Sequence, residues 1–223
     1  MNDVTGIWAV VPVKELANAK QRLVGALSPD QRQALCTAML EDVLAALAGV
    51  SPLAGILVVT VEPVAIALAA RYGARVRTEG ARDGHTGAVA ETARFLAASG
   101  GAGMLTVPGD IPAITSAEVA ATLAAHLPPP SFTIVPAHDD LGSNAIICSP
   151  PDAVKLRFGE NSFFPHLDAA RQSGIEPTIV RHAGIGMDID HAVDLAAFLR
   201  MKPSRPTRAR DFLERSGLAQ QLG

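Results

Sequence analysis

Short apolar stretches alternate with helix-forming segments along the chain, and this alternation limits the folds that it can adopt. The first stretch, Ile7 to Val13, is apolar at every position, as expected of a parallel strand that is buried on both faces. Further strands are expected at 55–61, 74–76, 104–107, 131–136, 145–148 and 176–181. The pattern predicts an α/β fold, a single domain with a mostly parallel sheet flanked by helices.

The helices between these strands have recognisable ends. Ser28, Pro29 and Gln31 have the spacing of a helix N-terminus with serine as the cap. Ser116 and Ser162 are expected to cap two later helices, at 117–127 and 163–173. The first helix then repeats an apolar residue at every fourth position, at Leu35, Met39, Val43 and Leu47. Other helices are expected at 63–72, 88–98 and 192–199.

Length and composition bound the class of protein. The 223 residues fit one large domain, expected at 1–200, with 201–223 as a polar, basic tail helix on the surface. The net charge of −3 offers no basic field to a nucleic-acid partner. No apolar run approaches the roughly 20 residues of a membrane span, and Cys36 and Cys148 are not spaced as a pair. These features predict a cytoplasmic protein with reduced thiols and no membrane contact.

One acid follows directly after a predicted strand end. Residues 104–107 lead into Pro108 and Gly109, which break the strand, and Asp110 comes next. Ligands of open α/β sheets bind beyond the carboxyl ends of the strands, so Asp110 is placed to hold a hard cation such as Mg²⁺ against a substrate phosphate. The alternative is a turn in which Asp110 caps its own backbone.

Two further acids, Asp188 and Asp190, follow the last predicted strand. On an extended segment, side chains at this spacing face the same side. Asp110 and one of these two acids are therefore expected to share one Mg²⁺, whose coordination substrate phosphates would complete. The alternative for Asp190 is the N-cap of the helix at 192–199.

Three cations, Lys14, Lys20 and Arg22, follow the first strand, where α/β nucleotide-binding proteins place phosphate contacts. The segment has neither a P-loop nor a dinucleotide-binding pattern, and the alternative is a solvated loop. The glycine-rich segment 80–88 either lets a ligand approach the start of the next helix or is an ordinary loop, with His85 at the surface or in a hydrogen bond. Without GxSxG or HExxH motifs, chemistry based on positioning and charge compensation fits best.

Several motifs together resemble the guanylyltransferases that make the activated phospho-acid precursor of the deazaflavin coenzyme F-420. The resemblance extends from about residue 7 to residue 198, and the motifs occur in the family's order. They are Val11 to Lys14 with Ala19 to Leu23, Gly84 to Val89, Val107 to Pro112, Gly142 to Asn144, Phe158 and Gly159 with Ser162, and Asp188 to Asp190. The resemblance implies a nucleotide-diphospho-sugar transferase fold, of the GT-A-like, Rossmann-related type. It also implies transfer of GMP from GTP to 2-phospholactate, phosphoenolpyruvate or 3-phosphoglycerate, with release of pyrophosphate.

The resemblance also implies roles for individual residues. Asp110, with Asp188 or Asp190, would hold Mg²⁺. The residues implied in catalysis are Lys14, Lys20, Arg22 and Asp110, the three cations contacting the triphosphate. Those implied in nucleotide binding are Pro12, Lys14, Lys20, Gly84, Thr86, Ala88, Pro108 and Gly109. Those implied in binding the phospho-acid are Ser143, Asn144, Gly159 and Ser162. Ser143 stands where the family often has threonine, which leaves the choice of acid open, and a homodimer is expected by analogy alone.

Three alternatives remain open at this point. The first is another magnesium-dependent nucleotidyltransferase, of the molybdopterin or cytidylyl type, which shares the sheet and the two-acid metal site. The second is a nucleotide-binding regulatory module without catalysis, although a module that only binds has no need of a second carboxylate. The third is a scaffold domain in which every motif is a turn or a helix cap.

Overall fold

The computed structural model describes residues 5–16, 19–202 and 204–222. In these ranges, seven strands form one sheet in the order β3-β2-β1-β4-β6-β5-β7. The strands are β1 Ile7–Pro12, β2 Leu53–Val59, β3 Arg75–Arg77, β4 Gly103–Thr106, β5 Ser131–Pro136, β6 Ser143–Ser149 and β7 Thr178–Ile179. Most neighbouring strands are parallel, and β6 is antiparallel to both β4 and β5. The predicted α/β class and mostly parallel sheet are confirmed.

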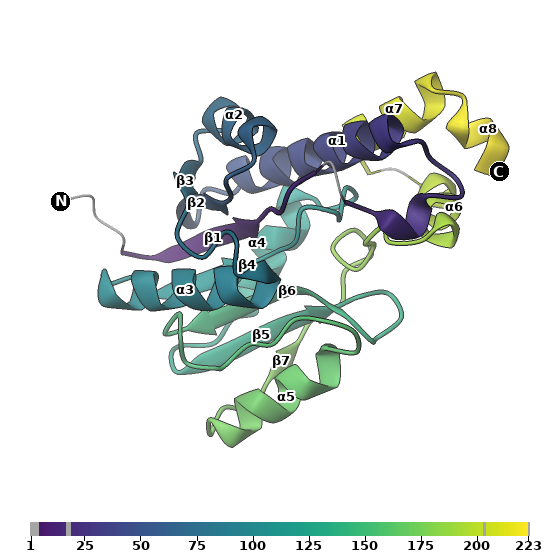
Figure 1. Ribbon diagram of the computed structural model, residues 1–223. Helices are drawn as coiled ribbons and strands as arrows, with labels where there is room; N and C mark the ends of the chain where they lie inside the picture. The colour runs from purple at the N-terminus through teal and green to yellow at the C-terminus, as the bar shows by residue number, and fades with distance from the viewer. Residues whose placement is uncertain (1–4, 17–18, 203, 223) are drawn as a thin grey trace.

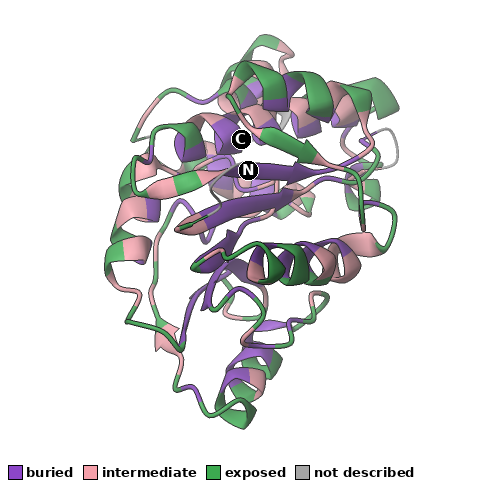
Figure 2. Cartoon of the chain, turned by 90° about the vertical axis from the view of Figure 1, so that its left-hand side faces the viewer, coloured by how far each residue is buried: buried purple, intermediate pink, exposed green. Residues whose placement is uncertain are grey.

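Helices cover both faces of this sheet (Figure 1). They are the 3-10 helix η1 Gln21–Leu23, then α1 Pro29–Ala48, α2 Pro63–Arg71, α3 Gly84–Ala98, α4 Ser116–Ala124, α5 Phe163–Gln172, α6 Ala192–Arg200, α7 Arg208–Arg215 and α8 Leu218–Leu222. One apolar core lies between the sheet and α1, and includes residues of α2, α4, α6 and α7. A second core lies on the other face, beneath α3 and α5. Figure 2 shows the central strands buried between these layers, with the outer helix faces exposed.

Successive side chains of β1 enter opposite cores. Ala9 and Val11 pack in the core beneath α1, whereas Trp8 and Val10 pack in the core beneath α3. All four are at most 2% exposed. A strand buried on both faces needs apolar residues at even and odd positions alike, which explains why this stretch of sequence shows no polar alternation.

Most predicted elements are present, and three local details differ from the prediction. The capping box and apolar stripe of α1 are confirmed. Helix α3 begins at Gly84, so part of the glycine-rich segment forms its first turn. Thr115, rather than Ser116, caps α4, because its hydroxyl accepts from the N–H of Glu118 while that glutamate accepts from Thr115. Ser162 precedes α5 but makes no capping hydrogen bond.

The C-terminal residues pack on α1 through α7. Ala209 and Leu213 of α7 are buried in the α1 core. The fully buried carboxylate of Asp42, on α1, accepts hydrogen bonds at 2.9 Å from the backbone N–H groups of Arg208 and Ala209. The first N–H groups of a helix have no partner within it, so this carboxylate anchors the start of α7. The outer side of α7 is exposed, and the division at residue 200 stays a prediction.

The two cysteines lie in different cores. Cys36 of α1 and Cys148 of β6 are buried and free, on opposite faces of the sheet. Burial raises the pKa of the Cys148 thiol to about 12, so it stays protonated. Across the described ranges, every helix is too short or too polar to cross a membrane.

Candidate active site

The strand order reverses beside β1, and this places a crevice at one edge of the sheet. The chain runs from β1 to β2 and β3 on one side, whereas β4 lies on the other side, and all four strands are parallel. Residues 12–14 and 108–110 leave β1 and β4 at this edge, where ligands of open α/β sheets bind. A pocket is present there. The predicted site residues that line it are Pro12, Lys14, Gly84, Ala88, Pro108, Gly109 and Asp110.

Two distant carboxylates converge on one ammonium group beside this pocket. Nζ of Lys20 lies 2.5 Å from Oδ2 of Asp110 and 2.6 Å from Oδ1 of Asp190. Because both oxygens contact the same nitrogen atom, the distance between the two oxygens cannot exceed the sum of these two distances. The N–H of Ile189 also donates to the carbonyl oxygen of Asp110 at 3.1 Å, which holds the two acidic segments side by side.

The ion pairs keep these groups charged. Burial opposes the charge of Lys20, but Asp110 and Asp190 outweigh burial and raise the pKa of Lys20 above its ordinary value. Burial also opposes the charge of Asp190, and Lys20 outweighs that effect and lowers the pKa of Asp190. Lys20 has φ 54° and ψ 45°, a left-handed conformation that costs a residue with a side chain about 1 kcal/mol or more. Strain of this kind is characteristic of functional sites.

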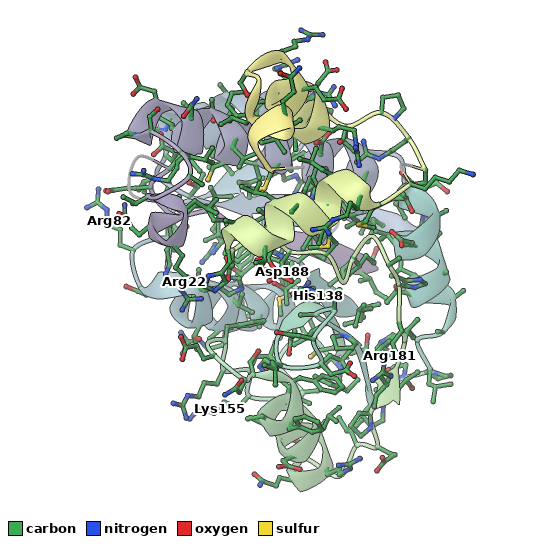
Figure 3. All side chains as sticks on the ribbon, turned by 90° about the vertical axis from the view of Figure 1, so that its right-hand side faces the viewer. Arg22, Arg82, His138, Lys155, Arg181 and Asp188 are labelled. Atoms are coloured by element: carbon green, nitrogen blue, oxygen red, sulfur yellow. The ribbon has the colours of Figure 1, made fainter. Side chains whose placement is uncertain are left out.

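Asp188 has different partners. Its Oδ1 accepts a hydrogen bond from Nδ2 of Asn144 at 3.0 Å and lies 3.9 Å from Nδ1 of His138. Burial raises the pKa of Asp188, and the neighbouring acids act in the same direction. Figure 3 shows Asp188 and His138 close together near the middle of the view, between α6 and α5, with Arg22 further to the left. Asp188 therefore lies beside the same acids, with its carboxylate engaged by the amide of Asn144.

The helix-cap interpretation of Asp190 is wrong. Oδ2 of Asp194 accepts hydrogen bonds from the N–H groups of Asp190 and His191 at the start of α6, so the Asp190 side chain is not needed there. Within the described ranges, no group of three His, Cys, Asp or Glu side chains is arranged to hold a metal ion. The two convergent carboxylates of Asp110 and Asp190 fit a hard cation that takes its other ligands from water and phosphate oxygens. In this structure the Lys20 ammonium supplies the positive charge between them.

The other predicted cations border these acids. Nη2 of Arg22 lies 2.7 Å from Oε1 of Glu160, and its Nη1 lies 3.8 Å from Oδ2 of Asp190. Lys14 is exposed and lines the pocket. Lys20 and Arg22 therefore face the acids, and Lys14 faces the pocket. The interpretation of this segment as a fully solvated loop is wrong.

Two of the residues implied in binding the phospho-acid, Ser143 and Ser162, form a buried polar cluster with His166. Oγ of Ser143, at the start of β6, lies 2.9 Å from Nδ1 of His166 and 3.2 Å from Oγ of Ser162. Ser162 and His166 are one helical turn apart at the start of α5. Asn144 uses its Nδ2 to brace the acidic segment, and Gly159 has φ 151°, which side-chain-bearing residues rarely adopt.

Phe158 connects the pocket with this polar cluster. Oγ1 of Thr86 accepts a hydrogen bond from the Phe158 N–H at 3.0 Å and donates to its carbonyl at 3.3 Å. The Phe158 ring packs against His85, with centroids 4.3 Å apart, and against His166, with centroids 5.0 Å apart. Burial lowers the pKa of both histidines to about 4, so both are neutral near pH 7.

Sequence reasoning did not find these histidine positions. His85 was expected at the surface or in a hydrogen bond, but it lines the pocket against an aromatic ring. His166 was not singled out at all. Its signal in the sequence is its spacing of four residues from Ser162 in a helix, which places both on one face.

Known proteins resemble this chain over nearly its whole length. The family model described as "guanylyl transferase CofC like" matches residues 7–221. A phosphoenolpyruvate guanylyltransferase of Rubrobacter xylanophilus is 37% identical over 209 residues, which cover 91% of this chain and 99% of that protein. A 2-phospho-L-lactate guanylyltransferase of Methanothermobacter thermautotrophicus is 33% identical, covering 93% of this chain and 89% of that protein.

A solved structure supports the fold. A protein of Desulfovibrio desulfuricans G20, described provisionally as a nucleotide-diphospho-sugar transferase, superimposes with a TM-score of 0.79 over 97% of both chains at 20% identity. This likeness shows the fold that the motifs implied. With the family model covering nearly the whole length and relatives above 30% identity, the chain belongs to the CofC-like guanylyltransferase family.

Proposed function

We propose that this protein transfers GMP from GTP to the phosphate of a phosphorylated three-carbon acid and releases pyrophosphate. The candidate acids are phosphoenolpyruvate, 2-phospho-L-lactate and 3-phospho-D-glycerate, and the product would be the activated precursor of coenzyme F-420. The observation that carries the proposal is the convergence of Lys20, Asp110 and Asp190 beside the pocket. Phe158 links that pocket to the Ser143 hydroxyl. Its ring packs against His85, which lines the pocket, and against His166, which is hydrogen-bonded to Ser143.

The pocket beyond the ends of β1 and β4 is where we place GTP. The small residues Gly84, Ala88 and Gly109 line it and leave room for a base and ribose to approach the backbone. The first N–H groups of α3 also have no partner within the helix, and they favour a negative charge at its start. Lys14 lies in the pocket lining, where its ammonium would reach the phosphates.

Asp110 and Asp190 are the residues that we expect to hold Mg²⁺. Asp190 is preferred to Asp188 because it already converges with Asp110 on a cation, whereas Asp188 is engaged by Asn144. When bound, the ion would offset negative charge on the triphosphate and on the leaving pyrophosphate. Lys20, released from the two carboxylates, would then be close enough to pair with a phosphate.

The proposed reaction needs no nucleophile from the protein. An oxygen of the acceptor phosphate attacks the α-phosphorus of GTP, and a new P–O bond forms. The bond from the α-phosphorus to the oxygen bridging the β-phosphate breaks, and its electron pair leaves with pyrophosphate. The attacking oxygen is already anionic, so no general base is required. Lys14, Lys20 and Arg22 offset the developing charge, while the Ser143 and Ser162 hydroxyls hold the acceptor in line.

A matrix of substrates tests this function. The protein, with Mg²⁺, is incubated with each of GTP, ATP, CTP and UTP, alone and with each of the three acids, and pyrophosphate is measured. We expect release only with GTP and an acid together. Release that depends on CTP would favour the cytidylyl-type alternative. No release with any pair would contradict the proposal and favour a binding or scaffold protein.

Three further parts belong to the proposal. The net charge of −3 supports the absence of a nucleic-acid partner, and the two unpaired cysteines support a cytoplasmic location. A homodimer is supported by the family resemblance alone. Light scattering of the purified protein measures the mass of the particle. A mass of two chains is the expected result, and a mass of one chain would remove the dimer from the proposal without affecting the reaction.

A further inference from the structure

A buried histidine lies behind the Ser143 hydroxyl, and the proposed reaction has no role for it. His166 is 1% exposed and lies on α5, one turn after Ser162. We propose that His166 is a positioning residue, which fixes the Ser143 hydroxyl as a hydrogen-bond donor toward the phospho-acid. This inference rests on the proposed function and deepens it, because it names what prepares the acid half of the site.

The hydrogen bonds of His166 determine which of its nitrogens carries the proton. The backbone N–H of Arg157 donates to Nε2 at 3.0 Å. A backbone amide can only donate, so Nε2 must present its lone pair. Burial keeps the ring neutral by lowering its pKa to about 4, so its single proton is on Nδ1. That nitrogen lies 2.9 Å from Oγ of Ser143 and therefore donates to it.

The direction of this hydrogen bond sets the role of Ser143. A serine hydroxyl has one proton and two acceptor positions. Nδ1–H of His166 fills one acceptor position, and the Ser162 hydroxyl donates to the same oxygen at 3.2 Å. With both acceptor positions of Ser143 filled, Oγ can act only as a donor to a further group. A phosphate or carboxylate has only acceptor oxygens, so this arrangement suits the anionic acceptor substrate.

The surroundings of His166 keep its ring in this orientation. Phe158 packs edge-on against it, with the ring centroids 5.0 Å apart and the planes at 63°. The N–H of Phe158 is in turn held by Thr86, on the first turn of α3. Both ring nitrogens are thus hydrogen-bonded, and one side of the ring is packed. In the other tautomer, the Nε2–H would point at the Arg157 N–H, so two donors would face each other.

Two variants distinguish the roles of the two ring nitrogens of His166. His166→Asn places an amide near the position of Nδ1, where it can still donate to Ser143. His166→Gln places an amide near the position of Nε2, where it can still accept from Arg157 but cannot reach Ser143. His126, hydrogen-bonded to Ser131 and other hydroxyls at the far end of β5 and β6, provides the control variant His126→Gln.

Steady-state kinetics on these proteins test the positioning role, with phosphoenolpyruvate or whichever of the three acids wild type turns over fastest. We expect His166→Gln to raise KM for the acid at least about tenfold, the scale of a hydrogen bond to a charged group. KM for GTP should stay within about twofold of wild type in every variant. His166→Asn and His126→Gln should keep KM for the acid near the wild-type value, because neither removes the donor to Ser143.

A double-mutant cycle asks whether His166 acts through Ser143. If it does, adding His166→Gln to Ser143→Ala should change KM for the acid little beyond Ser143→Ala alone, because the two changes remove one interaction. Multiplicative effects of the two changes would overturn the inference, as would equal effects of the Asn and Gln variants. A wild-type protein that turns over none of the three acids would instead overturn the proposed function.

The wild-type protein offers a measurement that does not depend on any variant folding. Proton–nitrogen correlation spectra of the histidine side chains at pH 7 distinguish the two neutral tautomers. We expect His166 to carry its proton on Nδ1 and none on Nε2. A proton on Nε2 would overturn the inference, because Nδ1 would then accept from Ser143 and the hydroxyl proton would no longer be available to the substrate.

Discussion

Nζ of Lys20 lies 2.6 Å from Oδ1 of Asp190, although the two residues are 170 positions apart in the chain. The contact joins the loop after β1 to the segment before α6. It also places a positive charge where the carboxylates of Asp110 and Asp190 meet. A divalent cation that uses both carboxylates must displace this ammonium, so metal binding and the position of Lys20 are coupled.

Removal of the ammonium should therefore strengthen metal binding in the absence of nucleotide. We expect Lys20→Met to bind Mn²⁺ about tenfold more tightly than wild type, a change of roughly 1.4 kcal/mol. The same variant should have a higher KM for GTP, because a phosphate contact is lost. Titration calorimetry with Mn²⁺ measures the first effect. The exposed Lys155→Met is the matched control, and weaker Mn²⁺ binding by Lys20→Met would show that Lys20 supports the ion rather than competing with it.

Asp110→Asn should slow the reaction strongly while leaving the fold intact. The change removes one of the two convergent carboxylates and its charge, and losing an electrostatic contact of this kind costs roughly 3 kcal/mol in the barrier. We expect pyrophosphate release to fall about 100-fold or more. Asp168→Asn, on the exposed side of α5, should have near-normal activity. Near-normal turnover by Asp110→Asn would refute the assignment of this carboxylate.

The neutral histidines make stability depend on pH. Burial holds the pKa of His166 at about 4, below the ordinary value of 6.5. Between these values the unfolded chain binds more protons, so the contribution of His166 to stability is complete above about pH 6.5 and is lost as the pH falls toward 4. We expect the free energy of unfolding to fall between pH 7 and pH 5, and to fall less in His166→Asn. Urea denaturation at the two pH values measures this, and an equal fall in both proteins would contradict it.

Asp42 should matter to stability and not to the reaction. Its buried carboxylate accepts from the first N–H groups of α7, and truncation leaves the part-buried donor of Arg208 and the buried donor of Ala209 without this partner. Each such donor costs about 1–3 kcal/mol, so Asp42→Ala should lower the free energy of unfolding by roughly 3 kcal/mol. Urea denaturation checks this against Asp168→Ala. A loss below about 0.5 kcal/mol would mean that water replaces the carboxylate.

Local sequence patterns predicted the elements well because strands and helices have short periods. The capping box of α1 depends on residues within one helical turn, and the apolar run of β1 depends on residues of a single strand. The motifs after β1 and β4 were also placed correctly at one edge, because parallel strands end together.

The remaining features depend on contacts between distant residues. Nothing near Ser162 in the sequence shows that its hydroxyl turns to Ser143 instead of capping α5. Similarly, Lys20 is expected to contact the triphosphate, and the sequence does not show that the fold also pairs it with two acids 90 and 170 residues further along the chain. Sequence reasoning left Asp188 and Asp190 as equal candidates, and our preference for Asp190 rests on the hydrogen bond that Asn144 donates to Asp188, which no local pattern predicts.

The most direct test of the central claim follows the phosphorus atoms of GTP. The protein is incubated with Mg²⁺, the preferred phospho-acid, and GTP labelled with ³²P at either the α or the γ position, and the products are separated. We expect the α label to join the acid and the γ label to leave in pyrophosphate. A γ label on the acid, or an α label found only in free GMP, would contradict transfer of GMP to the acceptor phosphate.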